Sequence, residues 1–476
     1  MQETWATSPG LDLHLELSGT RRRAALESAL RDAVRSGRLA AGTALPSSRA
    51  LAADLGVARN TVADAYGQLV AEGWLAARHG SGTWVAEHAA QVPLVSPAPA
   101  GVSSEGLRFN LRPGLPDVSA FPRAAWLAAA RRAVAGAPSR SLVGYGDPRG
   151  LQVLRVALAE YLARARGVSV TAERVIVCAG FSQGLELVCD LLRSRGEYAL
   201  AIEAYGHPAH RQVATSAGMS LVPVPVDDRG ALADGVPAGG ASALLLTPAH
   251  QYPLGVALAP ERRRLAVDWA TAGNGLIIED DYDGEFRYDR QAVGALQSLA
   301  PDDVVYAGTA SKSLAPGLRL GWLAVPDRLA RDITEIKRAT SRLSSSLDQL
   351  TLAEFISSGG YDRQVRRARL AYRKRRDRLV SELHRQVPGV AVSGIAAGLH
   401  VLVQLPAGVA EEDVIAAAAA RGLALEGLAS CRAGGQDRGP AVIVGYATPP
   451  GHAFSTCIAR LCAALADCAG TQSAKT

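Results

Sequence analysis

A proline-rich segment of low charge divides this chain into two regions whose hydrophobic patterns differ. Residues 88–106 (HAAQVPLVSPAPAGVSSEG) hold three prolines, several small residues and almost no charge, which is the composition of an extended linker. At about 3.1 Å per residue in polyproline geometry, such a linker spans roughly 60 Å. A loop on a domain surface is the alternative, but the change of pattern across the segment favours a linker. We therefore expect two domains, residues 1–87 and 107–476.

The composition narrows the class of protein. Of the 476 residues, 48% are hydrophobic and 20% are charged, so the chain can bury large cores. The six cysteines are too sparse for a disulfide scaffold and lack zinc-finger spacing, so we expect a reduced, cytoplasmic protein without a metal site. The sequence shows no secretory signal and no apolar run of roughly 18 residues, so no membrane span is expected. The net charge of +6 permits a nucleic-acid partner without requiring one.

Three helical patterns and a hairpin pattern fill the region before the linker. Apolar residues recur at helical spacing in each of the three, and Ser47 or Ser48 can cap the second, which ends at Gly56. Two short apolar runs around a glycine-rich turn follow. The expected elements are helices over residues 20–36, 47–56 and 58–73 and strands over residues 74–78 and 83–87.

The second and third helices, joined across residues 56–58, form a helix-turn-helix pattern to which the hairpin adds a wing. Such a unit presents polar side chains at the start of its second helix to base edges, while flanking groups hold phosphates. Arginine and asparagine suit this task because their fork geometry matches guanine and adenine. The candidate DNA-contacting residues are Arg49, Arg59, Asn60, Thr61, Arg78 and Ser81.

Shape and charge alone leave this assignment open. Many helical bundles contain such helix pairs, and residues 1–90 balance nine arginines against nine acidic residues, with no lysine. Binding would then rest on the placement of single arginines rather than on bulk charge. The string G-x-L-x-x-G-x-x-L-P-S-S-R-x-L-A-x-x-L-G-V-x-R-N-T-V at residues 37–62, followed by Y-x-x-L, EGW and GSGT, resembles the GntR-type winged helix. That resemblance implies operator binding as a dimer.

From about residue 107 onward, short apolar strands alternate with amphipathic helical stretches. This alternation predicts an α/β fold with a mostly parallel sheet. The candidate buried strands lie at residues 174–178, 198–202, 242–247, 275–280, 303–308 and 319–325.

Polar residues gather just past the carboxyl ends of these strands, where open α/β sheets bind ligands. AGFSQG (179–184) leads from a strand into a helix, whose N-terminus suits a phosphate. EDDYDGEF (279–286) offers carboxylates and a phenol, and GTASKS (308–313) places Lys312 among small hydroxyl residues. Each motif alone is weak, since acidic runs, glycine turns and serine-rich loops are common on surfaces. Their joint occurrence in this order is much less expected by chance.

A lysine, a carboxylate, a phenol and a phosphate site together suit pyridoxal 5'-phosphate (PLP). Its aldehyde forms a Schiff base with a lysine amine, and a carboxylate keeps its pyridine nitrogen protonated. A phenol hydrogen-bonds the ring oxygen, while hydroxyls, backbone N–H groups and an arginine hold the phosphate. Arg319, seven residues after Lys312, can supply that positive charge.

Together with YGDPRG (145–150) and TPAHQYPLG (247–255), these motifs resemble the fold-type I aminotransferases. The resemblance implies that Lys312 is the Schiff-base lysine, that Asp280 partners the pyridine nitrogen and that Tyr282 contacts the ring oxygen. It places His207 near the aromatic residue that stacks on the ring. The residues that it implies around the phosphate are Phe181, Ser182, Thr309, Ser311 and Arg319.

A GntR-type winged helix joined through a linker to an aminotransferase-like domain is the arrangement of MocR-type regulators, and this resemblance covers nearly the whole chain. It implies a homodimer, often head-to-tail, that binds double-stranded operator DNA and PLP. It also implies a transcriptional regulator rather than an enzyme. In the subgroup that controls vitamin B6 synthesis, the cofactor itself is the signal.

The arginines of the large region bear on whether it is also an enzyme. An aminotransferase usually holds the substrate carboxylate with an arginine, which the family pattern places close to the final strand, here residues 441–450. That stretch contains none, and the nearby candidates are Arg432 and Arg438. The segment at residues 205–207 supplies no arginine directly either, and Arg211 comes four residues later. We therefore expect weak or no transamination and assign no catalytic residue. PLP is favoured as the effector over another small amino compound.

Two other functions stay open at this point: a working aminotransferase with an accessory DNA-binding module, and a repressor whose large domain only dimerises.

A run of basic residues in the large region has two possible interpretations. Residues 362–378 carry nine basic side chains in a helical pattern. A solvated helix face is the simpler interpretation, and a positive surface that touches DNA beyond the winged helices is the sharper one.

Overall fold

The computed structural model divides the chain into two compact units, residues 1–103 and 104–476. The predicted linker and Ser81 lie outside the residues that the structure describes. The described residues are 6–8, 11–13, 22–78, 82–87, 107–236, 240–273, 275–288, 293–340, 344–435 and 437–473.

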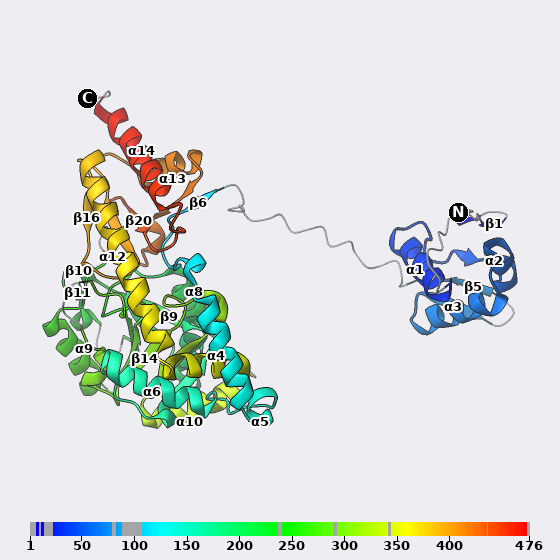
Figure 1. Cartoon of the computed structure of the whole chain (residues 1–476), viewed down its shortest axis with the longest axis horizontal. Coiled ribbons are helices and arrows are strands. Elements are labelled where there is room, and N and C mark those ends of the chain that lie inside the picture. Colours follow the sequence, from blue (N-terminus) through cyan, green and yellow to red (C-terminus); the bar gives the residue numbers. More distant parts are fainter. Residues whose placement is uncertain are drawn as a thin grey trace. The chain divides into compact units, whose positions relative to one another are not determined.

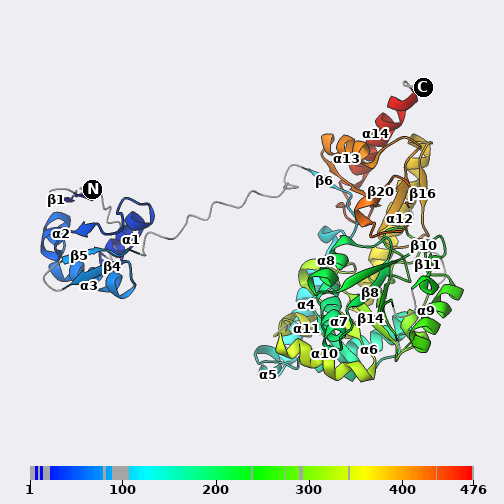
Figure 2. The same cartoon turned by 180° about the vertical axis from the view of Figure 1, so that it is seen from behind.

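The first unit is a small helical core with a three-stranded sheet (Figures 1 and 2). The sheet is antiparallel, with strand order β3-β5-β4. The elements are β1 (Ala6–Ser8), β2 (Leu11–Leu13), α1 (Arg22–Arg35), β3 (Ala44–Leu45), α2 (Ser48–Leu55), α3 (Arg59–Ala71), β4 (Leu75–Arg78) and β5 (Gly82–Val85).

Local sequence signals set the ends of the helix-turn-helix pair. The Ser47 hydroxyl accepts a hydrogen bond from the Ala50 N–H at 3.2 Å and caps α2. Gly56 ends α2 in the left-handed region at φ 61°, where a residue with a Cβ would be strained. The three predicted helices and the hairpin are thus confirmed. Their apolar faces, including Leu30 of α1 and Leu69 of α3, meet in one buried core.

The second unit is built on a seven-stranded sheet with strand order β7-β15-β14-β13-β12-β8-β9. All neighbouring strands are parallel except β15, which is antiparallel to both β7 and β14. The mostly parallel α/β sheet and its six predicted strands are confirmed, and β9 was not predicted. The strands are β7 (Val175–Cys178), β8 (Ala199–Glu203), β9 (Ser220–Val224), β12 (Ala243–Leu246), β13 (Leu276–Asp280), β14 (Val304–Thr309) and β15 (Gly321–Ala324).

Side chains alternate between the two faces of this sheet, and helices cover both. Ile176 of β7 packs among α7, α8 and α10, whereas its neighbour Val177 packs on the opposite side among α4, α6 and α11. α9 covers the part of that second side under β12 and β13. The helices are α4 (Arg123–Gly136), α5 (Ser139–Val143), α6 (Gln152–Arg166), α7 (Phe181–Ser194), α8 (Pro208–Ser216), α9 (Pro260–Gly273), α10 (Asp327–Ala339) and α11 (Ser346–Ser357).

A smaller C-terminal part contains a four-stranded antiparallel sheet with strand order β16-β17-β20-β19. The long helix α12 runs from the large sheet to this part in both views (Figures 1 and 2). β6 (Phe109–Asn110) pairs in parallel with β18 (Leu423–Ala424), so the chain after residue 106 starts on this part. The other elements are β10 (Val226–Asp227), β11 (Gly230–Ala231), α12 (Gly360–Gln386), β16 (Ala391–Ser393), β17 (His400–Gln404), α13 (Glu411–Ala420), β19 (Glu426–Gly427), β20 (Ala441–Gly445) and α14 (Phe454–Ser473).

None of the helices in the described part of the chain is both long enough and apolar enough to cross a bilayer.

A buried ion pair fixes the loop that follows β13. The guanidinium of Arg166, at the end of α6, donates to both carboxylate oxygens of Asp281 at 2.6 and 3.0 Å and to the Gly284 carbonyl at 3.0 Å. The hydroxyl of Tyr306 donates to the same carboxylate at 2.8 Å. Because both charged side chains are almost fully buried, losing one partner leaves the other charge without compensation.

We expect Arg166→Ala to lower the free energy of unfolding of the large unit by about 3–5 kcal/mol, measured by urea denaturation. Arg164→Ala is the matched control two residues away. Its guanidinium also pairs with a carboxylate, Asp362, but 61% of its side chain is exposed, so its loss costs at most about 1 kcal/mol. Equal losses in the two variants would contradict this account of the ion pair.

Candidate functional site

A cavity of about 330 Å³ lies at the carboxyl edge of the large sheet. Its walls come from segments that follow successive strands: the start of α7 after β7, the start of α8 after β8, the end of β13 and the loop after β14. This volume lies within the range of small-molecule sites. All nine residues predicted to hold PLP line the cavity, so the structure brings together Phe181, Ser182, His207, Asp280, Tyr282, Thr309, Ser311, Lys312 and Arg319.

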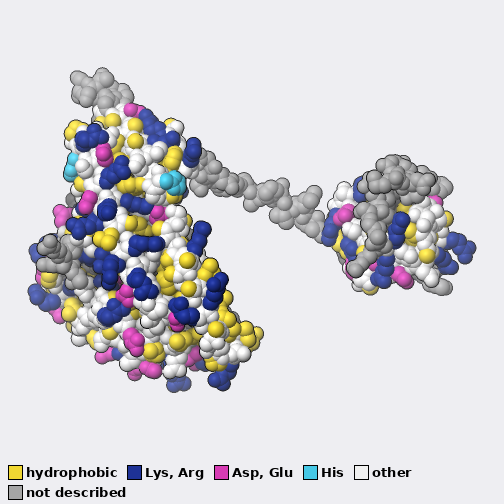
Figure 3. Space-filling model, in the orientation of Figure 1, with side chains coloured by type: hydrophobic (Ala, Val, Ile, Leu, Met, Phe, Trp, Pro, Cys, Tyr) yellow, Lys and Arg dark blue, Asp and Glu magenta, His cyan; other side chains and the backbone are white. Residues whose placement is uncertain are grey.

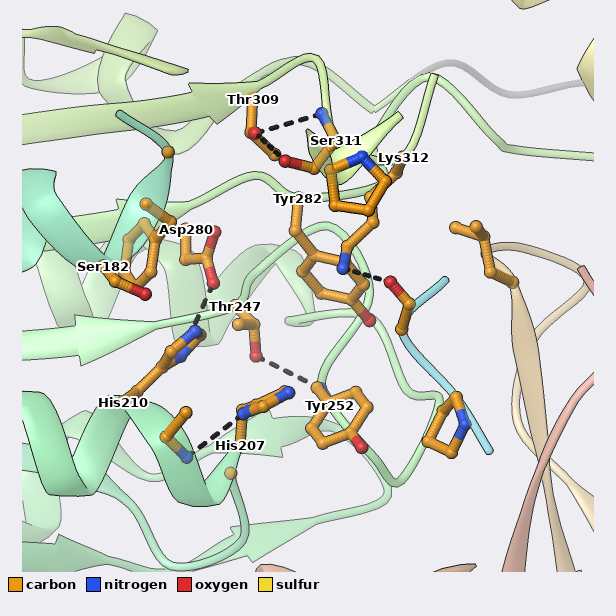
Figure 4. A pocket seen from close by; sticks show the side chains of 18 of the residues that line it. Ser182, His207, His210, Thr247, Tyr252, Asp280, Tyr282, Thr309, Ser311 and Lys312 are labelled. Carbon is orange, nitrogen blue, oxygen red and sulfur yellow. Dashed lines mark hydrogen bonds and ion pairs between the residues drawn. The ribbon is translucent and has the colours of Figure 1, made fainter. Parts of the chain in front are cut away.

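Lys312 and Asp280 enter the cavity from neighbouring strands (Figure 4). The Lys312 ammonium donates to the Gly114 carbonyl. Burial lowers the pKa of Lys312, and the Asp280 carboxylate partly offsets this effect. Burial likewise raises the pKa of Asp280 well above its usual value, against the influence of Lys312. The cavity therefore holds an amine and a carboxyl that both lack the solvation of free side chains.

Tyr282 lies in a buried hydrogen-bond network. Its hydroxyl donates to the His250 carbonyl at 3.0 Å and lies 3.2 Å from His250 Nδ1. The same nitrogen is 2.8 Å from Oδ2 of Asp283. Oδ1 of Asp283 is buried and has no hydrogen-bond partner within the described residues. His250, which is itself bonded to Asp283, therefore holds the hydroxyl of Tyr282, and Tyr282 lines the cavity.

An anion site lies at the N-terminus of α7. Gly180 precedes this helix, and a Cβ built there would lie 3.7 Å from the Arg319 guanidinium. Arg319 has a φ of 50°, the only positive value for a non-glycine residue within the described ranges, and such strain often marks a functional position. On the other side, the Thr309 hydroxyl donates to Ser311 Oγ at 2.8 Å. Free helix N–H groups, hydroxyls and an arginine form the donor set that holds a phosphate.

Several cavity residues were not predicted from the sequence. His210 lies three residues after His207 on α8, and the two rings stack at 5.0 Å between centroids. Its Nδ1 approaches Asp280 Oδ2 at 3.8 Å, and burial lowers the pKa of His210 well below its usual value. Helical spacing from His207 was the available signal for this residue. The other unpredicted polar lining residues are Glu203, Thr247, Tyr252 and His400. Arg211, which the sequence analysis considered for a substrate carboxylate, also lines the cavity.

Comparison with known proteins identifies both units. Residues 22–85 match the bacterial regulatory proteins of the gntR family, and residues 114–430 match aminotransferase class I and II. The HTH-type pyridoxine biosynthesis transcriptional regulator PdxR of Corynebacterium glutamicum is 34% identical over 88% of this chain and 91% of that protein. The probable rhizopine catabolism regulatory protein MocR of Rhizobium meliloti is 33% identical over 83% of this chain and 84% of that protein.

The crystal structure of an archaeal alanine:glyoxylate aminotransferase shares the fold of the large unit, with a TM-score of 0.69 and 23% identity over 75% of this chain and 91% of that one. The two regulators named above match most of this chain and most of their own length, and this similarity decides the family. The chain belongs to the MocR-type transcriptional regulators. Its large unit is an aminotransferase-like domain, whose cofactor is PLP, and the lysine, buried carboxyl, phenol and anion site of the cavity fit that group.

The three candidate carboxylate-binding arginines of this MocR-type regulator are occupied by the protein itself. Arg211 donates to the carbonyls of Gly206 and Cys431 at 3.0 and 2.7 Å, and also to Ser430. Arg432 pairs with Asp437 at 2.7 Å and Arg438 with Asp228 at 2.8 Å; neither lines the cavity. Of the described arginines, only Arg211 and Arg319 reach the cavity wall.

The DNA-binding unit of this MocR-type regulator displays the predicted contact residues. Arg59 and Asn60 are exposed at the first turn of α3, and Thr61 beside them is half-buried. Arg49 is exposed in the first turn of α2, and Arg78 is exposed at the end of β4, next to the wing turn.

Glu203, at the end of β8, gives the site a pH-dependent stability. Burial raises its pKa to about 7, although Thr247 and Gln251 donate hydrogen bonds to its Oε2. The folded protein thus binds this proton more tightly than the unfolded chain, whose carboxyl titrates near 4.5. The resulting stabilisation is complete below pH 4.5 and is lost as the pH rises to about 7.

We expect the Glu203→Gln variant, which cannot ionise, to gain stability relative to the wild type as the pH rises through this window. The full change in the unfolding free-energy difference is on the order of 3 kcal/mol. Urea denaturation of both proteins at several pH values measures it. An offset between the two proteins that stays constant from about pH 4.5 to about pH 7 would rule out a raised pKa at this position.

Proposed function

We propose that the protein is a cytoplasmic transcriptional regulator whose large domain binds PLP as a sensor and whose winged helix binds operator DNA. The observation that carries the proposal is a cavity lined by all nine residues predicted to contact PLP, while every candidate arginine for a substrate carboxylate is bonded to other groups of the chain. We assign residues 1–87 to DNA binding, 88–106 to the linker and 107–476 to the sensor. Control of vitamin B6 synthesis is favoured because the pyridoxine biosynthesis regulator PdxR is 34% identical over most of the chain.

Within this proposal, each polar group of the cavity has one task. Lys312 holds the cofactor through its amine, Asp280 partners the pyridine nitrogen, and Tyr282 contacts the ring oxygen. When bound, PLP supplies an aldehyde that reacts with amines and a ring that accepts electrons. His207 stacks on the ring, and the residues proposed to hold the phosphate are Phe181, Ser182, Thr309, Ser311 and Arg319.

The scarcity of lysine supports the role of Lys312. Among the 51 basic residues of the chain only four are lysines, at positions 312, 337, 374 and 475. The chain uses arginine for nearly every other cationic position, yet a guanidinium cannot supply the free amine that an aldehyde requires. Lys337, which is also buried, donates a hydrogen bond to the Val177 carbonyl, and neither residue lines the cavity.

The proposal also includes a homodimer. Large apolar side chains are exposed around α4, α5 and the start of α6, with Val143 81% and Tyr145 100% exposed. Leu127, Val134 and Val153 extend this surface. Exposed apolar groups in such density are typical of a protein interface, and a second copy is the partner that the family arrangement implies.

Lys312→Ala should abolish the near-visible absorbance that the wild type acquires with PLP. Reduction with borohydride followed by peptide mapping should add the cofactor mass to Lys312 alone, since only four lysines compete. The exposed Lys374→Ala variant serves as the control and should label as the wild type does. A wild type that stays colourless, or a label at another lysine, would contradict the assignment.

An active aminotransferase is the second candidate function, favoured by the complete PLP site. Incubating the PLP-loaded protein with amino donors separates the two. Rapid and complete conversion of the bound aldehyde to the amine form would favour the enzyme, whereas slow or absent conversion supports the sensor.

For the winged helix, we expect Arg59→Ala to weaken binding to a selected duplex by about 1–3 kcal/mol, because its exposed side chain starts the recognition helix. Binding to a duplex of random sequence should change less. Fluorescence anisotropy with both duplexes measures the difference. Equal losses on the two would show that Arg59 contacts a phosphate instead of a base.

A further inference from the structure

The net positive charge of this chain is concentrated on helix α12, about 290 residues after the recognition helix α3 in the sequence. Residues 1–90 are neutral, with nine arginines and nine acidic residues. Helix α12 alone carries ten basic against three acidic side chains, a net charge of +7, whereas the whole chain has +6. Phosphate neutralisation supplies much of the affinity of DNA-binding proteins. The winged helix therefore has no excess of positive charge for neutralising DNA phosphates, and the large unit does have such an excess on α12.

The structure separates the basic residues of α12 into two groups. Arg375 is structural: it pairs with the buried Asp117 at 2.6 Å and donates to the carbonyls of Ala447 and Pro449. Arg376 is half-buried, and its Nε has no hydrogen-bond partner within the described residues. These two side chains are partly buried against the protein, so seven of the nine basic residues over 362–378 are exposed.

The seven exposed residues form what we call the α12 basic surface. It consists of Arg363, Arg366, Arg367, Arg369, Arg373, Lys374 and Arg378. Dark blue side chains follow the course of this helix across the face shown in Figure 3. At 1.5 Å per residue the surface is about 22 Å long, a length over which a DNA duplex carries roughly a dozen phosphate charges.

Most of this charge is not neutralised within the chain. Arg367 and Arg369 donate to the carbonyls of Ala120 and Glu285, bonds that orient the guanidinium groups without cancelling their charge. Arg373 has a carboxylate contact, to Asp377 at 3.9 Å. No carboxylate of the described residues pairs with Arg366 or Lys374. A surface of largely uncompensated positive charge, two of whose guanidinium groups are oriented by backbone carbonyls, suits a polyanion with regularly spaced charges.

We propose that the α12 basic surface binds the phosphate backbone of duplex DNA outside the segment read by the winged helices. This inference rests on the proposed function, because it assumes that the full chain binds DNA. The contact is independent of base sequence, so it adds affinity and salt dependence but no preference among sequences.

The test compares two double variants of the full-length protein that remove the same charge. Arg366→Gln with Arg373→Gln alters the α12 basic surface, and Arg264→Gln with Arg331→Gln alters exposed arginines on α9 and α10. Affinity is measured as a function of NaCl concentration for a long duplex selected from a random library by the wild type and for an unselected duplex of equal length. The oligomeric state of each variant is followed by analytical ultracentrifugation.

We expect the α12 variant to reduce the magnitude of the slope of log K against log salt by about 0.9 for each lost phosphate contact, which is about 1.8 for each subunit that contacts DNA and about 3.6 for both subunits of the proposed homodimer. Its ratio of affinities for the selected and unselected duplexes should equal that of the wild type. The control variant should keep the wild-type slope.

Three outcomes would overturn the inference: an α12 variant with the slope of the control, a loss of preference for the selected duplex, or dissociation of the α12 variant where the control stays assembled. The last outcome would assign the surface to a second copy of the chain. Failure of the proposed function gives a different result, because the wild type itself would then select no duplex from the library.

Discussion

A buried amine and a buried carboxyl share one cavity at the carboxyl edge of a parallel sheet, and the large unit is arranged around them. Neither group has the solvation that its charge requires, and each shifts the pKa of the other toward the charged form. β13 and β14 are adjacent parallel strands, so Asp280 at the end of β13 lies at the same edge of the sheet as the loop after β14 that carries Lys312. A ligand that bonds to the amine and donates a charged hydrogen bond to the carboxylate satisfies both groups, and PLP, through its protonated pyridine nitrogen, is such a ligand.

The same geometry explains why a fold of aminotransferases serves a regulator. The residues proposed to hold PLP all line one cavity, whereas Arg211, Arg432 and Arg438 are bonded to carbonyls or carboxylates of the chain. Gly114, whose carbonyl accepts from Lys312, lies only eight residues after the predicted linker. Lys312, the residue proposed to hold the cofactor, therefore contacts the stretch of chain that follows the predicted linker.

The sequence predicted the parts that depend on local pattern. Six buried strands were visible as uninterrupted apolar runs, and Ser47 and Gly56 marked the ends of α2. β9 was missed because its five residues include Pro223, which is tolerated there because β9 is an edge strand. Nine cofactor-site residues lay in short motifs after strands, but His400 and Tyr252 reach the cavity only through tertiary packing. Which arginines of α12 face the protein also depends on partners distant in sequence, such as Asp117.

The most direct test of the account is the affinity of the full-length protein for its selected duplex, with and without PLP, in the wild type and in Lys312→Ala. If cofactor occupancy shifts the equilibrium between two states, the ligand must bind them with different affinity. The account predicts that PLP changes the DNA affinity or the footprint of the wild type and leaves the variant unaffected. Identical footprints and affinities of the wild type in the presence and absence of PLP would contradict it.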